Sequence, residues 1–214
     1  MSDPTLLRRE DVYERLRAEI LSCELLPGSS INEATLAQRF KVSKTPIRDA
    51  LSRLHAQKLL LVIPRKGYRV APISVSDATD LFEFRVWLEE RCVRSACADA
   101  ADEELRDLNK LRTKPGKQGF VDYNRNFHLA LIELAPNRRL VEAAREVIEQ
   151  FDRLVVMSLS AIEWDFTPLV KEHGAIIDAL QDRNATLAGR LVVQHVKSAK
   201  KRVLGALSSQ AVVP

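Results

Sequence analysis

The 214-residue sequence lacks several features that would assign it to a particular class of protein. No apolar run approaches the roughly 20 residues needed to span a bilayer. The N-terminus has no signal-peptide pattern, so we expect a cytoplasmic protein without a membrane partner. The sequence has only three cysteines, Cys23, Cys92 and Cys97. They are odd in number and form no CxxC pair, which favours buried thiols in a reducing cytosol over a disulfide framework. Internal repeats and low-complexity tracts are also absent.

Strong net charge is absent as well, since the whole chain carries only +4. The charge is nevertheless unevenly divided. Residues 1–75 hold 13 Lys and Arg against 8 Asp and Glu, whereas the remainder holds 20 against 21. The basic excess therefore lies in the N-terminal third, as expected of a DNA-binding module, although its size alone would not identify one.

Residues 36–54 form the most informative stretch, because they predict a short helix, a tight turn and a second helix. Thr45 suits the N-cap of the second helix, and Pro46 suits its first helical position. A buried stripe follows at helical spacing: Ile47, Ala50, Leu51 and Leu54. The other face is basic and polar: Lys44, Arg48, Ser52 and Arg53. A DNA major groove admits such a helix, but an ordinary amphipathic helix with a solvated basic face has the same pattern.

Two β-prone runs follow, at residues 59–63 and 68–71, around a short turn that contains Gly67. They predict a hairpin with Arg65 and Lys66 at its tip, where phosphates could lie. Upstream, an additional first helix that ends at Pro27-Gly28 is predicted by four apolar residues at helical spacing, Val12, Leu16, Ile20 and Leu21. The combination predicts a winged helix-turn-helix.

Beyond residue 77 the sequence is helical nearly throughout. We expect helices near 77–100, 102–112, 120–134, 138–162, 168–182 and 185–208, with a loop at 113–119, a turn at 135–137 and a helix start at 165–168. About six helices with short connections predict an antiparallel bundle. The predicted fold class is therefore mostly α, with a winged-helix domain at 1–72, a linker at 73–77 and a helical domain at 78–214.

Arg85 lies on a helix face that is otherwise apolar. A buried guanidinium needs an anionic or hydrogen-bonding partner. Two partners are open at this point: Glu89 one turn later in the same helix, or a bound carboxylate.

Three of the four histidines lie in helical segments of the second region. Asn124 and His128 are four residues apart and project from the same side of one helix. His173 and His195 each have apolar neighbours in later helices, whereas His55 lies at the end of the recognition helix. These histidines are either satisfied core residues or a three-histidine set that binds a divalent transition metal such as zinc or nickel. Glu172 is the nearest carboxylate, but it adjoins His173 on a helix and should point elsewhere.

The first region contains, in this order, Pro27-Gly28, Leu36-Ala37, the run from Val42 to Leu51, and Gly67-Tyr68-Arg69-Val70. With these motifs it resembles the winged-helix domain of GntR-type bacterial transcription regulators over residues 8–72. The resemblance implies that Lys44, Thr45, Arg48 and Gly67 lie at the DNA, with Lys66 beside them. Many relatives carry a DNA-contacting Arg where this chain has Ala34, so that contact is not carried over.

The second region contains the motifs Arg85-x-x-Leu88-Glu89, Asn124-x-x-Phe127-His128, Glu172-His173 and His195. With these motifs it resembles the helical effector-binding (FCD-type) domain of the FadR-like branch over residues 77–208. The resemblance implies metal ligands at Asn124, His128, His173 and His195, and an effector carboxylate held by Arg85 and Asn124. Because Asn is neutral where some relatives have Asp, a divalent ion would stay uncompensated, and we expect an anionic effector to complete the site.

These observations predict a transcription regulator, which we expect to act as a repressor, rather than an enzyme. It would bind a palindromic operator as a homodimer, and a small carboxylate metabolite would modulate its affinity. One alternative is a metal-dependent enzyme that acts on a carboxylate substrate. A second is a DNA-architectural protein in which Arg85 and the histidines are only structural.

Overall fold

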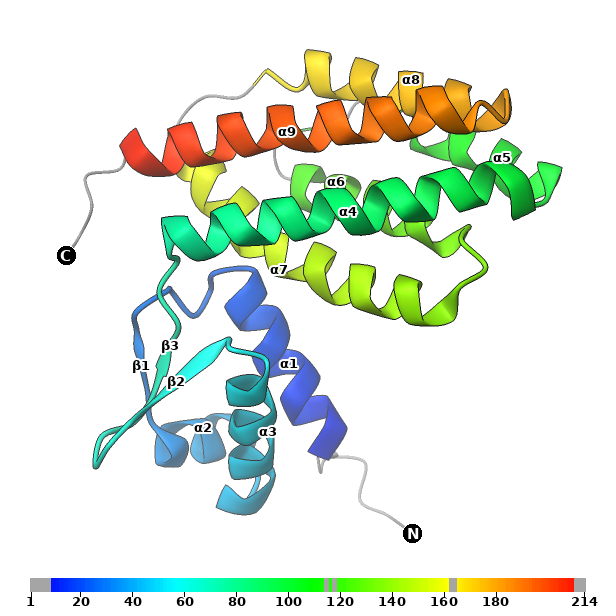
Figure 1. Ribbon diagram of the computed structural model, residues 1–214. Coiled ribbons are helices and arrows are strands. Elements are labelled where there is room, and N and C mark those ends of the chain that lie inside the picture. Colours follow the sequence, from blue (N-terminus) through cyan, green and yellow to red (C-terminus); the bar gives the residue numbers. More distant parts are fainter. Residues whose placement is uncertain (1–8, 114–115, 117–118, 162–164, 210–214) are drawn as a thin grey trace, which may run out of the picture. The chain divides into compact units, whose positions relative to one another are not determined.

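The computed structural model describes residues 9–113, 116, 119–161 and 165–209. It confirms the predicted fold class: a winged helix-turn-helix with a small antiparallel sheet is followed by a helical domain (Figure 1). Contacts divide the chain into two compact units, Met1–Ile73 and Ser74–Pro214. No helix of the described part is both long and apolar enough to cross a bilayer.

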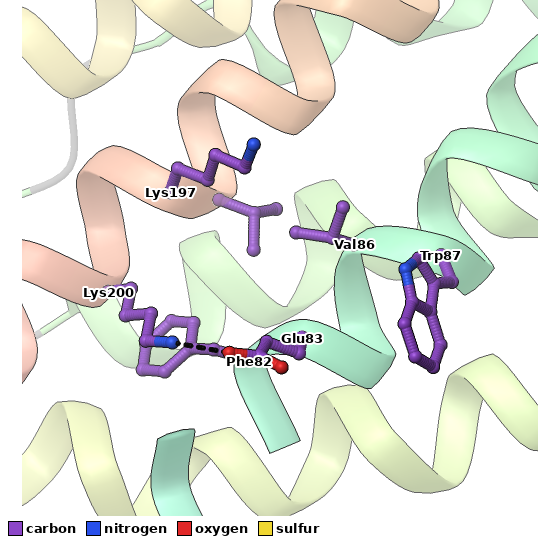
Figure 2. Close-up of a pocket in the computed structure, with 7 residues that line it drawn as sticks. Phe82, Glu83, Val86, Trp87, Lys197 and Lys200 are labelled. Carbon is purple, nitrogen blue, oxygen red and sulfur yellow. Dashed lines mark hydrogen bonds and ion pairs between the residues drawn. The ribbon is translucent and has the colours of Figure 1, made fainter. Parts of the chain in front are cut away.

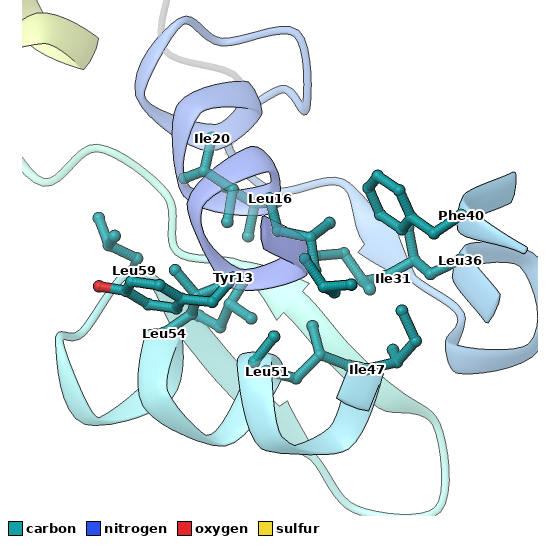
Figure 3. Packing of buried hydrophobic residues seen from close by; sticks show 14 of the residues in the cluster. Tyr13, Leu16, Ile20, Ile31, Leu36, Phe40, Ile47, Leu51, Leu54 and Leu59 are labelled. Carbon is teal, nitrogen blue, oxygen red and sulfur yellow. The ribbon is translucent and has the colours of Figure 1, made fainter. Parts of the chain in front are cut away.

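The first unit follows the order helix, strand, two helices, two strands. Its elements are α1 (Arg9–Leu21), β1 (Ser30–Ile31), α2 (Glu33–Phe40), α3 (Lys44–Ala56), β2 (Leu60–Ile63) and β3 (Gly67–Val70). The apolar stripes predicted for α1 and α3 are confirmed, since all four residues named for each stripe are buried. Helix α1 packs against α3, and α2 adds Leu36 and Phe40 to a single apolar core (Figure 3).

Two helix ends differ from the prediction. Helix α3 begins at Lys44 after an N-cap at Ser43, so Thr45 is not the N-cap and Pro46 is the third helical residue. Pro is tolerated there because the first four N–H groups of a helix have no intrahelical partner. Helix α1 ends at Leu21, well before Pro27-Gly28, because Cys23 adopts a left-handed backbone conformation with φ of 58°.

The predicted hairpin is confirmed, but it is part of a three-stranded sheet with the order β1-β3-β2. Ile63 pairs with Gly67 and Leu60 with Val70, while the short β1 adds Ser30 opposite Arg69. The sequence did not indicate β1, because two residues are too few for an alternating pattern.

The second unit contains α4 (Val75–Asp99), α5 (Asp102–Asp107), the 3-10 helix η1 (Leu108–Leu111), α6 (Phe120–Glu133), α7 (Arg138–Ala161), α8 (Thr167–Gln181) and α9 (Ala185–Ser209). The helix expected at 102–112 changes to 3-10 geometry midway, where Leu105, Leu108 and Leu111 recur every three residues and so share a face. Parts of the predicted loop at 113–119 (114, 115, 117 and 118) and residue 162 lie outside the described residues.

Helix α4 is central to the second unit, because it packs against α6, α7, α8 and α9. Ser74 caps it by accepting a hydrogen bond from the Asp77 backbone N–H at 3.2 Å. Its most extensive contact is with α9, and the two helices lie side by side in Figure 1. This packing brings the inward faces of helices that are distant in sequence onto one interior.

Candidate functional site

Three histidines meet in the interior of the second unit. His128 comes from α6, His173 from α8 and His195 from α9, and each is at most 2% exposed. The Nε2 atom of His195 lies 3.3 Å from the Nε2 atoms of both His173 and His128. One ligand atom from each residue lies within 4.8 Å of the others. The structure therefore brings together the three histidines that the sequence analysis singled out.

The outer nitrogen of each imidazole has its own partner. His128 Nδ1 lies 2.7 Å from a carboxylate oxygen of Glu89, and His195 Nδ1 lies 2.7 Å from Glu172. His173 Nδ1 lies 3.0 Å from the hydroxyl of Tyr123. Phe127 stacks on the His173 ring at a centroid separation of 3.5 Å. All three rings are thus held in orientation from behind, as is usual for histidines that bind a metal.

These partners fix the tautomers of the three rings. A carboxylate only accepts hydrogen bonds, so Nδ1 of His128 and of His195 carries the proton. The Tyr123 hydroxyl donates to the Leu111 carbonyl at 3.2 Å and so accepts from His173 Nδ1. Burial raises the pKa of Tyr123 to about 12, which keeps this phenol protonated. Each Nε2 therefore presents a lone pair.

Lone pairs facing one another at 3.3 Å are a natural binding place for a cation. Two nitrogens at ordinary zinc–nitrogen bond lengths and a tetrahedral angle would lie about 3.3 Å apart. The donor set and its spacing thus fit a divalent transition metal.

The protonation of the histidines suits the same role. Burial is the main cause that lowers the pKa of all three, with the nearby Arg85 charge adding to the effect at His128. At His195 the hydrogen bond to Glu172 opposes burial but does not cancel it. The imidazoles are therefore neutral near pH 7, as metal ligation requires.

Arg85 is 3% exposed and forms an ion pair with Glu89, which is fully buried. The first of the two partners open for Arg85 is therefore confirmed. The other carboxylate oxygen of Glu89 faces His128, so Glu89 links the arginine to the histidine cluster. The i, i+4 spacing predicts the first contact, but no sequence signal connects Glu89 with a residue 39 positions later.

The prediction that Glu172 points away from the histidines was wrong. It does not face its neighbour His173, but α9 packs beside α8 and brings the His195 ring to it. Arg202 on α9 also donates to Glu172, at 3.2 and 3.3 Å. Burial alone would raise the pKa of Glu172, yet the hydrogen bonds from His195 and Arg202 lower it to about 2. Glu172 is thus ionised and fully engaged as a support for His195.

A small cavity adjoins the cluster on the side of Asn124. Its polar lining comes from Arg85, Asn124, His128 and Arg202. Its volume is about 20 Å³, the space of roughly one water molecule. The Arg202 Nε atom is buried without a hydrogen-bond partner among the described residues. The cavity therefore places nitrogen donors beside an open side of the three-histidine cluster.

The predicted DNA-contacting residues lie on the surface of the first unit. Lys44, Thr45 and Arg48 are exposed at the start of α3. The Arg48 side chain remains 65% exposed although its Nε atom donates to Glu33 on α2 at 2.8 Å. Arg53, on the same helix, is turned back toward α1, where it donates twice to Glu10 and lies over the Tyr13 ring.

The wing supplies the other two predicted residues, and Lys66 and Gly67 are both exposed. The turn closes with a 3.0 Å hydrogen bond from the Lys66 N–H to the Ile63 carbonyl. Gly67 has φ of +92°, and a Cβ atom there would lie 3.3 Å from the Ile31 carbonyl oxygen. Glycine is thus favoured at this position both by the left-handed backbone and by the close approach of β1.

Comparisons with known proteins agree with this architecture. Residues 8–70 match the model of "Bacterial regulatory proteins, gntR family", and residues 80–198 match the "FCD domain". The chain is 29% identical over 191 residues to the Nta operon transcriptional regulator of Aminobacter aminovorans, covering 86% of this chain and 89% of that protein.

One further relative and one solved structure match nearly the whole chain. The HTH-type transcriptional repressor RspR of Escherichia coli is 24% identical over 208 residues, covering 94% of this chain and 91% of that protein. The solved structure of E. coli McbR/YncC superimposes with a TM-score of 0.77 at 21% identity, covering 93% of this chain and 96% of that one.

Proposed function

The chain belongs to the GntR family of bacterial transcription regulators with a C-terminal FCD domain, and on that basis we propose that it is a metal-dependent, carboxylate-responsive repressor. It is a DNA-binding transcription regulator and not an enzyme, as the sequence predicted. Repression is proposed because relatives such as RspR and GlaR of E. coli are named as repressors.

The observation that carries the metal proposal is the convergence of three Nε2 lone pairs, with the His195 Nε2 atom 3.3 Å from each of the other two and an acceptor behind each ring. His128, His173 and His195 would hold a divalent transition metal such as zinc or nickel. Asn124, one helical turn before His128 and lining the same cavity, would offer its carbonyl oxygen. Such an ion supplies a positive centre that attracts an acid.

The charge of the surrounding groups explains why an acid should bind there. Arg85 is neutralised by Glu89, and Arg202 is paired with Glu172. The three histidines and Asn124 are neutral, so a divalent ion would add two uncompensated positive charges in a buried place. Burial of unpaired charge is costly. We therefore expect metal and carboxylate to bind cooperatively, with Arg85 and Asn124 holding the acid.

The small cavity suggests how the signal leaves the site. A carboxylate metabolite is larger than one water molecule, so its entry must displace side chains of the cavity wall. Arg85 in that wall belongs to α4, the first helix after the DNA-binding unit. A shift of α4 would bias the arrangement of the DNA-binding units. A coupling of about 1–3 kcal/mol changes operator affinity roughly 5- to 150-fold.

On the DNA side, Lys44, Thr45 and Arg48 of α3 would enter the major groove, and Lys66 and Gly67 of the wing would contact the adjacent backbone. One winged helix makes few contacts. We therefore propose a homodimer on a palindromic operator, in which two copies combine their affinities.

The experiment is a calorimetric titration of the full chain with Zn²⁺ and Ni²⁺, with and without a panel of mono- and dicarboxylates. We expect metal binding that at least one acid strengthens. At a roughly hundredfold excess of metal over Kd, the free energy of unfolding should rise by about 2.7 kcal/mol. The double variant His128→Ala, His173→Ala should lose both effects and still shift operator DNA. His55→Ala is the matched control, because His55 lies outside the cluster.

Two results would contradict the proposal. Absence of metal binding in the wild type would remove the metal centre. Equal metal affinity with and without every acid tested would remove the proposed coupling, while leaving the metal centre itself intact.

A further inference from the structure

The most exposed large apolar side chain of the described residues is Trp87, at 68%. Phe84, one turn earlier on α4, is 45% exposed. Residues three and four apart share a face of a helix, so the two rings form one apolar patch. Large aromatic side chains gathered on a surface are typical of contact sites, since each can bury much area with few rotatable bonds.

Trp87 stands at the edge of a groove between α4 and α9 (Figure 2). The groove has a volume of about 310 Å³. Apolar groups from Phe82, Val86 and Val196 line it, and Lys197 and Lys200 lie along its α9 side. The patch and the groove together offer a protruding and a receiving surface on the same face of the domain.

Charged side chains flank Trp87 on the same face of α4. Asp80 and Glu83 precede Trp87, whereas Arg91 and Arg94 follow it. Asp80 and Arg91 have no ion-pair partner in the described part of the chain, while Glu83 contacts Lys200 at 3.1 Å and Arg94 contacts Glu90 at 2.9 Å. Glu90 lies on this face as well, but Arg94 pairs with it. Among the described residues, the charges left without an ion-pair partner are therefore Asp80 before the aromatic centre and Arg91 after it.

We infer that this face of α4 is the surface through which a second copy of the chain docks, with the two α4 helices antiparallel and the two-fold axis beside Trp87. In that arrangement Glu83 faces Arg91 of the second copy, and Asp80 faces Arg94 of the second copy. A parallel arrangement would set like charges against each other. Only a surface that is its own complement can form such a symmetric contact, and this sign pattern has that property.

The inference rests on the proposed homodimer and adds its location. The aromatic centre would supply the affinity, and the charges at its two ends would set the direction of the helices. The metal centre does not use Phe84, Trp87 or Arg91, so changes to this face leave the histidine cluster as it is.

The first test is Trp87→Glu in the full chain, with the mass measured by sedimentation at micromolar concentration. Because the change acts twice in a symmetric dimer, we expect dimerisation to weaken about a thousandfold, as for a buried aromatic anchor. Leu26→Glu is the matched control, since Leu26 is 59% exposed but lies in the other unit. A dimer that survives Trp87→Glu, or that Leu26→Glu weakens equally, overturns the inference.

The second test exchanges the charges. Arg91→Glu alone and Glu83→Arg alone should each weaken the dimer on the order of tenfold, because each places like charges opposite one another in both halves. The double variant Glu83→Arg, Arg91→Glu should restore the wild-type constant. Losses that add up in the double variant, instead of cancelling, contradict the antiparallel pairing.

These tests are separable from those of the proposed function. If the variants dissociate as expected and still bind Zn²⁺, both proposals stand. If Zn²⁺ binding fails in the wild type while Trp87→Glu still yields monomers, the metal proposal fails and the docking surface stands. A wild-type dimer with an intact Zn²⁺ response that ignores all these substitutions refutes the docking surface alone.

Discussion

The two units of this chain have different kinds of core. The core of the first unit, around Leu16, Leu51 and Leu54, consists of aliphatic and aromatic side chains. Every buried polar or charged residue of the described chain lies in the second unit: Arg85, Glu89, Asn124, His128, Asp152, Arg153, Ser158, His173 and His195. An apolar core only has to be filled, whereas a polar core has to be paired. The candidate functional residues of the first unit therefore lie on its surface, whereas those of the second unit lie in its interior.

The largest expected effect concerns the buried ion pair between Arg85 and Glu89 in the second unit. Glu89→Ala should lower the free energy of unfolding of the helical domain by about 3–5 kcal/mol, because it leaves the buried Arg85 unpaired. It also removes the acceptor behind His128. The next residue, Glu90, forms a half-exposed ion pair with Arg94, so Glu90→Ala should lower the free energy of unfolding by less than about 1 kcal/mol. Urea denaturation followed by circular dichroism measures both, and similar losses would remove the contrast.

The apolar core should respond to lost volume instead. Leu51→Ala should cost about 2–5 kcal/mol by opening a cavity against α1 and should weaken operator binding. The Zn²⁺-induced shift of the melting temperature should persist, since the histidines lie in the other unit. Leu61→Ala, on the 42% exposed side chain of β2, should change stability by less than about 0.5 kcal/mol. Loss of the Zn²⁺ response in Leu51→Ala would mean that the two cores are not independent.

On the surface of the first unit, Arg48→Ala should cost on the order of 1–3 kcal/mol of operator binding if Arg48 contacts a base pair. Arg53→Ala is a control from the same helix, because Arg53 is held by Glu10 and Tyr13 and should matter mainly for folding. A mobility-shift titration compares the two. Unchanged binding by Arg48→Ala would refute its assigned role.

The weakest expected effect is the pH dependence of the metal-free protein. Burial lowers the pKa of His128, His173 and His195 below 6.5, so the unfolded chain binds more protons than the folded domain. The contribution of the neutral histidines is complete above pH 6.5 and is lost as the pH falls below it. Thermal melts from pH 7.5 to 5 should show this decline, and it should shrink in His128→Gln, His173→Gln. A decline of the same size in that variant would assign it to other groups.

Asp152 acts in the opposite sense within the same pH window. Burial raises its pKa to about 6, although the hydrogen bond from Arg125 opposes this. The folded domain therefore binds a proton more readily there than the unfolded chain does, and stability falls as the pH rises from about 4 through 6. Asp152→Asn should make the acid decline caused by the histidines steeper.

The sequence by itself determined the elements and the candidates. The stripe from Ile47 to Leu54 and the near-continuous helices after residue 77 follow from local periodicity, which the chain carries wherever it folds. The same periodicity placed Arg85 among apolar neighbours and gave it Glu89 as a partner. Where local pattern was short, as at Ser30–Ile31, or where a cap depended on neighbouring backbone, as at Ser43, the prediction missed or misplaced the element.

Only the tertiary structure decided which atoms meet. His128 and His195 are 67 residues apart, and their Nε2 atoms come within 3.3 Å because α6, α8 and α9 pack on one interior. The same packing turned Glu172 toward His195 and set Tyr123 and Glu89 behind the other two rings. Periodicity tells which way a side chain faces from its own helix. What it faces depends on the distances between helices, which no local pattern contains.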